Sequence, residues 1–155
     1  MDEIYYSPTI IHNLLSTHNS IFVSSENENK TVKFDNNGTV EYSTPIRLKL
    51  IEITDQNTVF GWYNLAFQTQ IVFPMGDYPT FNAPFVSSWV QYDEGTNTIM
   101  CCSQGARVRI YKASDWSLWK EIDFDVQLAS VYHLGHVIIF DTMNNDTFFY
   151  VPQFN

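Results

Sequence analysis

Apolar and polar residues alternate along most of the chain, and this two-residue period predicts β-strands. In the clearest segment Ile46, Leu48 and Leu50 alternate with Arg47 and Lys49, which gives a strand one buried and one solvated face. Polar turn signals separate such segments every ~8–12 residues. Strands are predicted at residues 20–25, 31–34, 39–42, 46–54, 59–63, 65–73, 85–92, 98–103, 107–112, 119–125, 129–134, 136–141 and 147–151.

The N-terminal segment follows a helical period instead. Ser7 and Pro8 form an N-cap followed by a proline at the first helical position. The apolar residues that follow fall on one helical face, namely Ile10, Ile11, Leu14 and Leu15. We therefore expect a helix over roughly residues 8–18, held by packing on a sheet because isolated helices of this length are marginal. A weaker helical pattern, capped by Ser114, covers residues 114–121.

The segment 74–84 interrupts the strand pattern. It contains three prolines and one glycine, which argue against a central strand. Long ordered loops are usually functional or cover another part of the fold. Tyr78 and Phe81 make this loop a candidate contact surface.

These elements predict a mainly β (α+β) fold in one domain over residues 1–155. Ten or more short antiparallel strands would form a twisted sheet system, packed on the N-terminal helix. Residues 108–124 and 137–151 each resemble a strand-turn-strand of a β-propeller blade. Two such units do not close a propeller and the chain is short for one, so a sandwich or a curved sheet is favoured.

The charge balance argues against two classes of partner. Lys and Arg number 8 against 17 Asp and Glu, for a net charge of −9, and the basic residues are scattered singly. Nucleic acid and anionic membranes both select basic patches, so neither partner is expected. The chain has no apolar run of ~20 residues and begins with the acidic Met1-Asp2-Glu3. We therefore expect a soluble protein without a signal peptide or membrane insertion.

The candidate catalytic and metal-binding residues are few. His133 and His136 resemble a metal pair, but a zinc site needs three or four converging ligands. The adjacent Cys101 and Cys102 point to opposite faces of a strand, so they are poorly placed to pair with each other. Asp123 and Asp125 share a strand face, and solvated strand acids are the simpler interpretation. No nucleophile elbow or phosphate loop occurs, so we predict no enzyme activity, no metal and no cofactor.

Aromatic residues are abundant, with 12 Phe, 9 Tyr and 4 Trp. Most of them would form the core, and core is the favoured interpretation for Trp62 and Trp89. Rings left at the surface can stack on the apolar faces of sugars, while Asn, Asp and Arg bind the hydroxyls. The predicted ligand-binding residues, chosen by type and by turn or loop placement, are Trp62, Tyr78, Asn82, Tyr92, Arg109 and Trp116.

Three segments of the chain have the form of elements in one known family. Leu48–Glu52 followed by Val59-Phe60-Gly61 has the form of a strand, a turn and a Phe-Gly step, and Arg107–Tyr111 has the form of a central strand that ends in an aromatic residue. Thr147–Pro152 is similar to that family's closing strand. Together these segments resemble the head domain of a rotavirus spike protein, which implies binding of cell-surface glycans at the virion surface without enzyme activity. No site residues are carried over from the family.

Three functions remain open from the sequence. The leading hypothesis is a viral-type attachment domain that binds glycans through a shallow groove lined by aromatic, Asn and Arg side chains. The second is a structural or assembly protein of a virus or phage particle, with its exposed aromatics buried in contacts with another structural protein. The third is a small hydrolase, which would require a deep pocket that holds two titratable groups.

Overall fold

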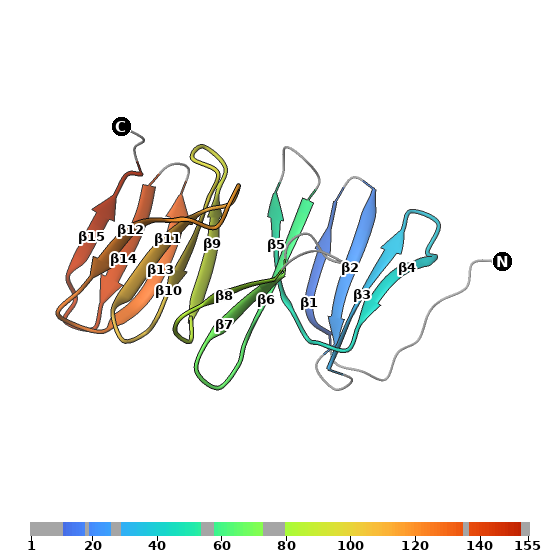
Figure 1. The fold of residues 1–155 in the computed structure, drawn as a ribbon, viewed down its shortest axis with the longest axis horizontal. Coiled ribbons are helices and arrows are strands. Elements are labelled where there is room, and N and C mark those ends of the chain that lie inside the picture. The colour runs from blue at the N-terminus through green and yellow to red at the C-terminus, as the bar shows by residue number, and fades with distance from the viewer. Residues whose placement is uncertain are drawn as a thin grey trace. The chain divides into compact units, whose positions relative to one another are not determined.

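The computed structural model describes residues 11–17, 19–25, 29–53, 58–72, 80–134 and 137–152. These residues form fifteen β-strands in four antiparallel sheets, and no helix occurs among them (Figure 1). None of the described residues therefore belongs to a helix that could cross a membrane. The chain divides into two compact units, Met1–Tyr63 with Phe73–Tyr78 and Asn64–Val72 with Pro79–Asn155. The single domain over residues 1–155 stays a prediction.

The first sheet belongs to the first unit and contains four consecutive strands in the order β1-β2-β3-β4. They are β1 (Ile11–Ser16), β2 (Ser20–Ser25), β3 (Lys30–Asp35) and β4 (Val40–Thr44). The Asp35 carboxylate accepts hydrogen bonds from the backbone N–H groups of Asn37 and Thr39, both at 2.8 Å. Gly38 adopts a φ of 82° in the same turn. This turn therefore connects the two strands predicted at residues 31–34 and 39–42.

The predicted N-terminal helix is wrong over the part of it that the structure describes. Residues 11–16 form β1, which pairs with β2 in register from Leu14↔Val23 to Ser16↔Ile21. Thr17 closes the turn, because its Oγ1 accepts the backbone N–H of Ser20 at 3.1 Å. A strand gains a complete ladder from its neighbour, whereas a short helix has only its own few hydrogen bonds. Residues 8–10 and 18 lie outside the described part.

The second sheet has the order β5-β6-β7-β8. Its strands are β5 (Lys49–Ile53), β6 (Thr58–Asn64), β7 (Thr69–Val72) and β8 (Thr80–Ala83). In the first unit, a Cβ at Gly61 would lie 2.6 Å from Leu48 Cδ1, so a larger residue there would have to displace the buried Leu48 side chain. In the second unit, Leu65 N donates to Gln68 O at 2.8 Å, so residues 65–68 form a turn rather than the predicted start of β7.

Strand β8 was not expected, because it lies within the proline-rich segment 74–84. Its four residues fit between Pro79 and Pro84, and it pairs with β7 from Thr69↔Ala83 to Val72↔Thr80. It is the last strand in the order of its sheet. An edge position is the place where prolines next to a strand cost the fewest hydrogen bonds.

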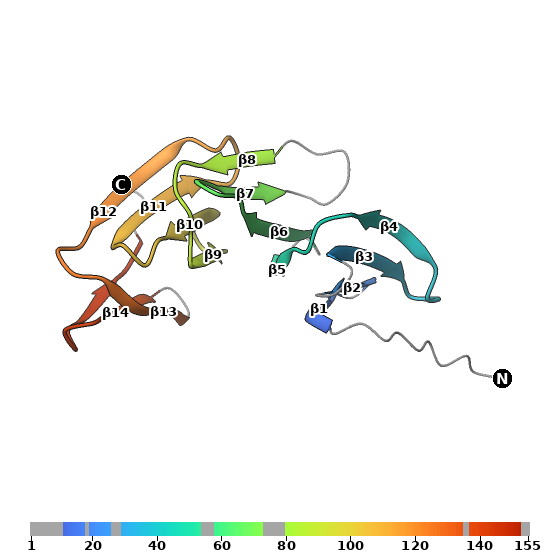
Figure 2. The same cartoon turned by 90° about the horizontal axis from the view of Figure 1, so that it is seen from below.

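The third and fourth sheets belong to the second unit, and Figure 2 shows their strands side by side from a second direction. The third sheet contains β9 (Trp89–Asp93), β10 (Thr98–Cys102), β11 (Arg107–Lys112) and β12 (Leu118–Asp123). The fourth contains β13 (Leu128–Leu134), β14 (Val137–Thr142) and β15 (Thr147–Tyr150). The helix considered for residues 114–121 is wrong, because Ser114 and Asp115 belong to a turn and β12 begins at Leu118.

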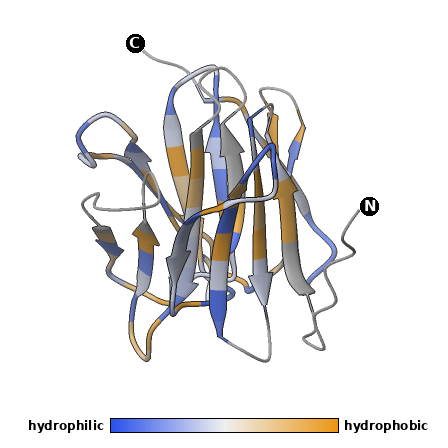
Figure 3. Cartoon of the chain, turned by 90° about the vertical axis from the view of Figure 1, so that its right-hand side faces the viewer, coloured by the Kyte–Doolittle hydropathy of each residue, from blue (hydrophilic) through white to orange (hydrophobic). Residues whose placement is uncertain are grey.

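These two sheets share a hydrophobic core. Each contributes four buried side chains, which are Met100, Cys102, Val108 and Ile110 from the third sheet and Leu128, Val131, Ile138 and Phe140 from the fourth. Full burial of one such large apolar side chain stabilises a fold by about 1.5–3 kcal/mol. Orange and blue bands alternate along the strands in Figure 3, as expected for strands with one apolar face.

Candidate functional site

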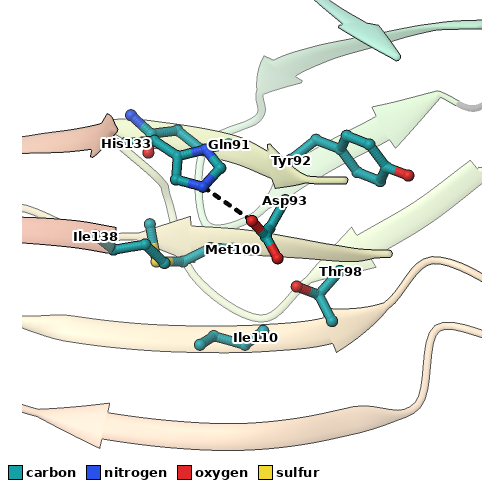
Figure 4. Close-up of a pocket in the computed structure, with 8 residues that line it drawn as sticks. All are labelled: Gln91, Tyr92, Asp93, Thr98, Met100, Ile110, His133 and Ile138. Carbon is teal, nitrogen blue, oxygen red and sulfur yellow. Dashed lines mark hydrogen bonds and ion pairs between the residues drawn. The ribbon is translucent and has the colours of Figure 1, made fainter. Parts of the chain in front are cut away.

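The turn between β9 and β10 is built around a buried carboxylate. Asp93 Oδ2 accepts the backbone N–H of Thr96 at 2.9 Å and also the hydroxyl of Thr96. The other oxygen, Oδ1, lies 3.0 Å from Nε2 of His133, which comes from β13. Figure 4 shows the imidazole of His133 facing the Asp93 carboxylate. A polar bond therefore joins the third and fourth sheets at this point.

A small cavity lies next to this pair, lined by residues Gln91, Tyr92, Asp93, Thr98, Met100, Ile110, His133 and Ile138. The centre of a water molecule can move over about 10 Å³ inside it. That is room for about one water molecule. Gln91 Oε1 is buried without a hydrogen-bond partner, whereas its Nε2 donates to Val131 O at 3.3 Å. The cavity is too small for a substrate and suits a structural water.

An aromatic stack lies between β8 and the turn that follows β11. The Phe81 ring is parallel to Trp116, with 4.7 Å between centroids and 5° between planes. The same ring meets Tyr111 edge-on at 4.6 Å. Phe81 lies in residues 80–84, the described end of the proline-rich segment, so this end contacts Trp116. Such pairs contribute ~0.5–1.5 kcal/mol beyond their buried area.

Trp116 has an unusual backbone conformation, with a φ of 62°. Bulky residues rarely adopt this region, and those that do are often found at functional positions. The turn holds it there: Trp116 N donates to Lys112 O at 2.8 Å. The Ser117 hydroxyl and backbone N–H both donate to Asp115 Oδ1, at 2.7 and 2.9 Å. The Ser117 hydroxyl is the main reason that the pKa of Asp115 is lowered, so this exposed carboxylate is ionised.

The two turns of the third sheet are joined to each other. Ala113 N donates to Asn97 O at 2.9 Å, and the Tyr92 hydroxyl donates to Asn97 Oδ1 at 2.8 Å. Asn97 sits at a φ of 50°, which asparagine tolerates well. The turns therefore present one set of aromatic, amide and carboxylate groups. We call the residues Phe81, Tyr92, Asn97, Asp115 and Trp116 the turn platform.

Two of the predicted ligand-binding residues belong to this surface, and two others lie on the strands β8 and β11 beside it. Tyr92 and Trp116 belong to the turn platform, and both are half-buried. Asn82 follows Phe81, is exposed, and accepts a hydrogen bond from Gln70 Nε2 at 3.1 Å. Arg109 lies two residues before Tyr111 on β11 and pairs with Asp123 at 2.8 Å and with Glu121 at 3.2 Å. The bond to Asp123 is the main cause that raises the pKa of Arg109.

The other two predicted residues are placed differently. Trp62 belongs to the first unit and is only 5% exposed, so it is a core residue. Lys49 Nζ lies 4.6 Å from the centre of its ring. Tyr78 lies outside the described residues. Trp89 is half-buried and packs against the shared core of the third and fourth sheets.

Some residues of the site were not selected from the sequence. Asn97 and Asp93 were not selected, and His133 was considered only as a metal ligand, because the partners of these residues are set by the packing of turns and sheets. The sequence of residues 93–97 does indicate a turn, because Asp and Asn are common turn residues, but it does not indicate which residues the turn would contact.

The candidate catalytic chemistry finds no support in the described residues. No group of three or more His, Cys, Asp and Glu side chains gathers there to hold a metal ion. Burial raises the pKa of the Cys101 thiol to about 12 and that of Cys102 well above its usual value. Thiols held protonated in this way are poor nucleophiles. Asp123 pairs with Arg109, and His136 lies outside the described residues.

Comparison with known proteins gives a structural likeness only. No protein-family model matches the chain, and no curated protein does. Hsv2 of Kluyveromyces marxianus superposes with a TM-score of 0.69 at 15% identity, over 97% of this chain and 50% of that one. The WD40 β-propeller domain of Doa1 gives 0.65 at 15% identity, over 92% and 51%. The computationally designed Ika4 protein gives 0.67 at 8% identity, over 96% and 95%.

These similarities show the fold, which is that of WD40 β-propeller structures, in which each sheet is a blade. The chain spans about half the length of the Hsv2 and Doa1 structures. The predicted sandwich or curved sheet packed on a helix is therefore wrong. The argument against a propeller failed because it required the whole ring within this chain.

The resemblance to the rotavirus spike head is also wrong, since the matched structures are WD40 propellers. Its three segments are alternating strands that many β-domains contain. The prediction of a viral-type attachment domain that binds glycans is therefore wrong. Carbohydrate as the partner and the alternative of a viral or phage assembly protein are wrong for the same reason.

Proposed function

We propose that the chain is a protein-interaction scaffold and that its turn platform binds a segment of a partner protein. The WD40 propeller fold is the observation that carries this proposal, because such propellers typically act as non-enzymatic scaffolds. Absence of enzyme activity stays a prediction. The inert buried thiols favour it.

The turn platform has the features of a protein-binding surface. Trp and Tyr are enriched at the residues that dominate interface energies. Here Trp116 is half-buried, stacked on Phe81 and held by its turn, so little conformational entropy is lost when a partner covers it. The fixed position of the ring is therefore an advantage for binding.

The charge of the surface indicates the kind of segment that would fit. Asp115 is exposed and ionised, and the whole chain carries a net charge of −9. A partner segment with Lys or Arg beside an apolar or aromatic side chain would match both the carboxylate and the rings. Binding should then weaken as salt is added, because exposed charges are screened within about 10 Å at 0.1 M salt.

A displayed library of random peptides, selected on the purified chain, tests this proposal. We expect enrichment of basic-aromatic peptides, whose affinity is then measured by fluorescence anisotropy. Trp116→Ala should weaken binding about tenfold or more. Asp115→Asn should weaken it less and remove part of the salt dependence. Phe67→Ala is the matched control, because Phe67 is 86% exposed in the turn after β6 and is not part of the platform.

Two results would contradict the proposal. If the selection enriches no peptide, the turn platform does not bind a partner segment. If the selected peptides bind Trp116→Ala as tightly as the original chain, their binding site lies outside the turn platform. A circular dichroism melt of each variant separates loss of binding from loss of fold.

A further inference from the structure

The fourth sheet has two apolar faces, and nothing in the described structure covers one of them. Register aligns Tyr132, Ile139 and Phe149 across β13, β14 and β15, and it aligns Leu134 with Val137 in the next row. Phe149 and Leu134 are both 71% exposed. We call these five residues the β13–β15 outer face. The opposite face holds Val131, Ile138 and Phe140 in the shared core, so both faces of this sheet are apolar.

The first sheet has an equivalent face. Register aligns Ile21, Phe34 and Val40 across β2, β3 and β4, and it aligns Leu14, Val23 and Val32 in the adjacent row. Leu14, Ile21 and Val40 are exposed and the other three are half-buried. We call these six residues the β1–β4 outer face. On the opposite side of this sheet Phe22, Ser24 and Thr31 are buried.

Two apolar faces on the outer sheets of one chain are unusual, because soluble proteins rarely leave large apolar patches in water. In a propeller, each blade packs its faces against the blades beside it. The third sheet shows this arrangement here, since all five residues of β10 are buried. The outer faces are therefore suited to another blade.

The observations favour a second copy of this chain as the source of that blade. The matched Hsv2 and Doa1 structures contain about as much chain again as this chain covers. Two copies supply that amount. The rims of the two faces also differ in charge: Lys30 aligns beside Val32 on the first, and Asp141 lies beside Ile139 on the second. One face of each kind meets its complement when two copies associate.

We propose that two copies of this chain form a closed pair, in which the β1–β4 outer face of each copy packs on the β13–β15 outer face of the other. Such a contact joins two different surfaces. The assembly is closed only if both faces of each copy are occupied by the other copy. The proposal uses the fold and not the binding of a partner at the turn platform. Its failure would leave the proposed function standing.

Light scattering coupled to size-exclusion chromatography tests the pair, using the full 155-residue chain over a range of concentrations. The expected mass is twice the 18.0 kDa of one chain. A mass of one chain at high concentration would overturn the proposal, and would leave the faces to further blades of a longer polypeptide or to another protein. A mass that keeps growing with concentration would also overturn it, because the contact would then be open-ended.

Single charges identify the surfaces in contact. Phe149→Glu on one face and Val40→Glu on the other should each shift the dissociation constant of the pair upward by about a hundredfold or more, because an unpaired charge would be buried. Phe67→Glu adds the same charge at an exposed Phe that belongs to neither face and should leave the pair intact. If Phe149→Glu alone has an effect, the fourth sheets meet each other and the proposed contact is wrong.

A mixture of the two variants gives an independent result. A pair that contains one Phe149→Glu chain and one Val40→Glu chain has one doubly altered contact and one unaltered contact. The mixture should therefore associate more strongly than either variant alone. Equal weakness of the mixture and the separate variants would contradict the proposal, provided that melts show each variant folded.

Discussion

Strands β10 and β14 are the second strands, in chain order, of the third and fourth sheets, but the burial of their residues differs. All five residues of β10 are buried, so both faces of its sheet are covered. Along β14, buried and half-buried residues alternate, with Ile138, Phe140 and Thr142 buried. Both strands are mainly apolar, so composition alone does not separate them. The difference shows that apolar sequence indicates which faces can be covered, whereas the surrounding sheets decide which ones are.

Charge substitution should break this comparison most strongly. Ile99→Asp and Met100→Asp lie on opposite faces of β10, and both should prevent folding, because each buries an unpaired carboxylate. In β14, Ile138→Asp should do the same, whereas Ile139→Asp should leave the dilute chain folded. Far-UV circular dichroism of the four purified variants checks this. Loss of fold in Ile139→Asp at low concentration would mean that its face is covered within one chain.

Truncation of two phenylalanines should give a smaller contrast within one sheet. Phe140 is 1% exposed in the shared core, and Phe140→Ala should destabilise the fold by about 3–5 kcal/mol. Phe149→Ala, on the outer face, should change the stability of the dilute chain by less than about 0.5 kcal/mol. Urea titration followed by fluorescence measures both values. Similar losses for the two variants would contradict the difference between the faces.

The bond between the two sheets should contribute less than the core. His133→Ala leaves the buried Asp93 oxygen without its partner across the sheets, while the bonds from Thr96 remain. A loss of about 1–3 kcal/mol is expected in the same titration. His133→Gln retains a donor and should recover part of that loss. Equal stability of His133→Ala and the original chain would mean that the pair does not hold the sheets together.

The smallest expected effect is the dependence of stability on alkaline pH. The pKa values of Cys101 and Tyr111 are raised to about 12 by burial, from 9.0 and 10.0. The stability that these neutral groups confer is fully present below about pH 9 and is lost as the pH rises toward 12, because the unfolded chain releases its protons first. Urea midpoints from pH 8 to 11 measure this. Cys101→Ala should flatten the fall, and an unchanged slope would contradict the assignment to Cys101.

The strands could largely be predicted from alternation, and β2 and β11 were predicted at the residues where the structure has them. Strand β8 was missed because its flanking prolines mask a four-residue strand at a sheet edge. The helix was expected because residues 10–15 satisfy a helical spacing, while the ladder to β2 that decides their conformation is a tertiary contact. The division into four sheets could not be predicted, because a two-residue period fixes faces and not neighbours.

The candidate site was predictable in part for the same reason. Trp116 and Tyr92 were selected by residue type and turn placement. The structure joins Tyr92 to Asn97, joins Asn97 to Ala113 in the turn that holds Trp116, and stacks Trp116 on Phe81. The stack on Phe81 brings together residues 35 positions apart in the chain, so no local pattern indicates it. Trp62 has the same residue type as Trp116 but lies in the core.

The consecutive order of strands in every sheet has a kinetic consequence. Asp93 pairs with Thr98 across a four-residue turn, and Arg107 and Cys102 lie near the ends of the next hairpin. Closing such short loops costs little entropy, and chains with local contacts fold faster than those that need distant pairings. Each blade can therefore form its hairpins while the rest of the chain is still unfolded. Assembly of blade on blade is then the step that we expect to limit the folding rate.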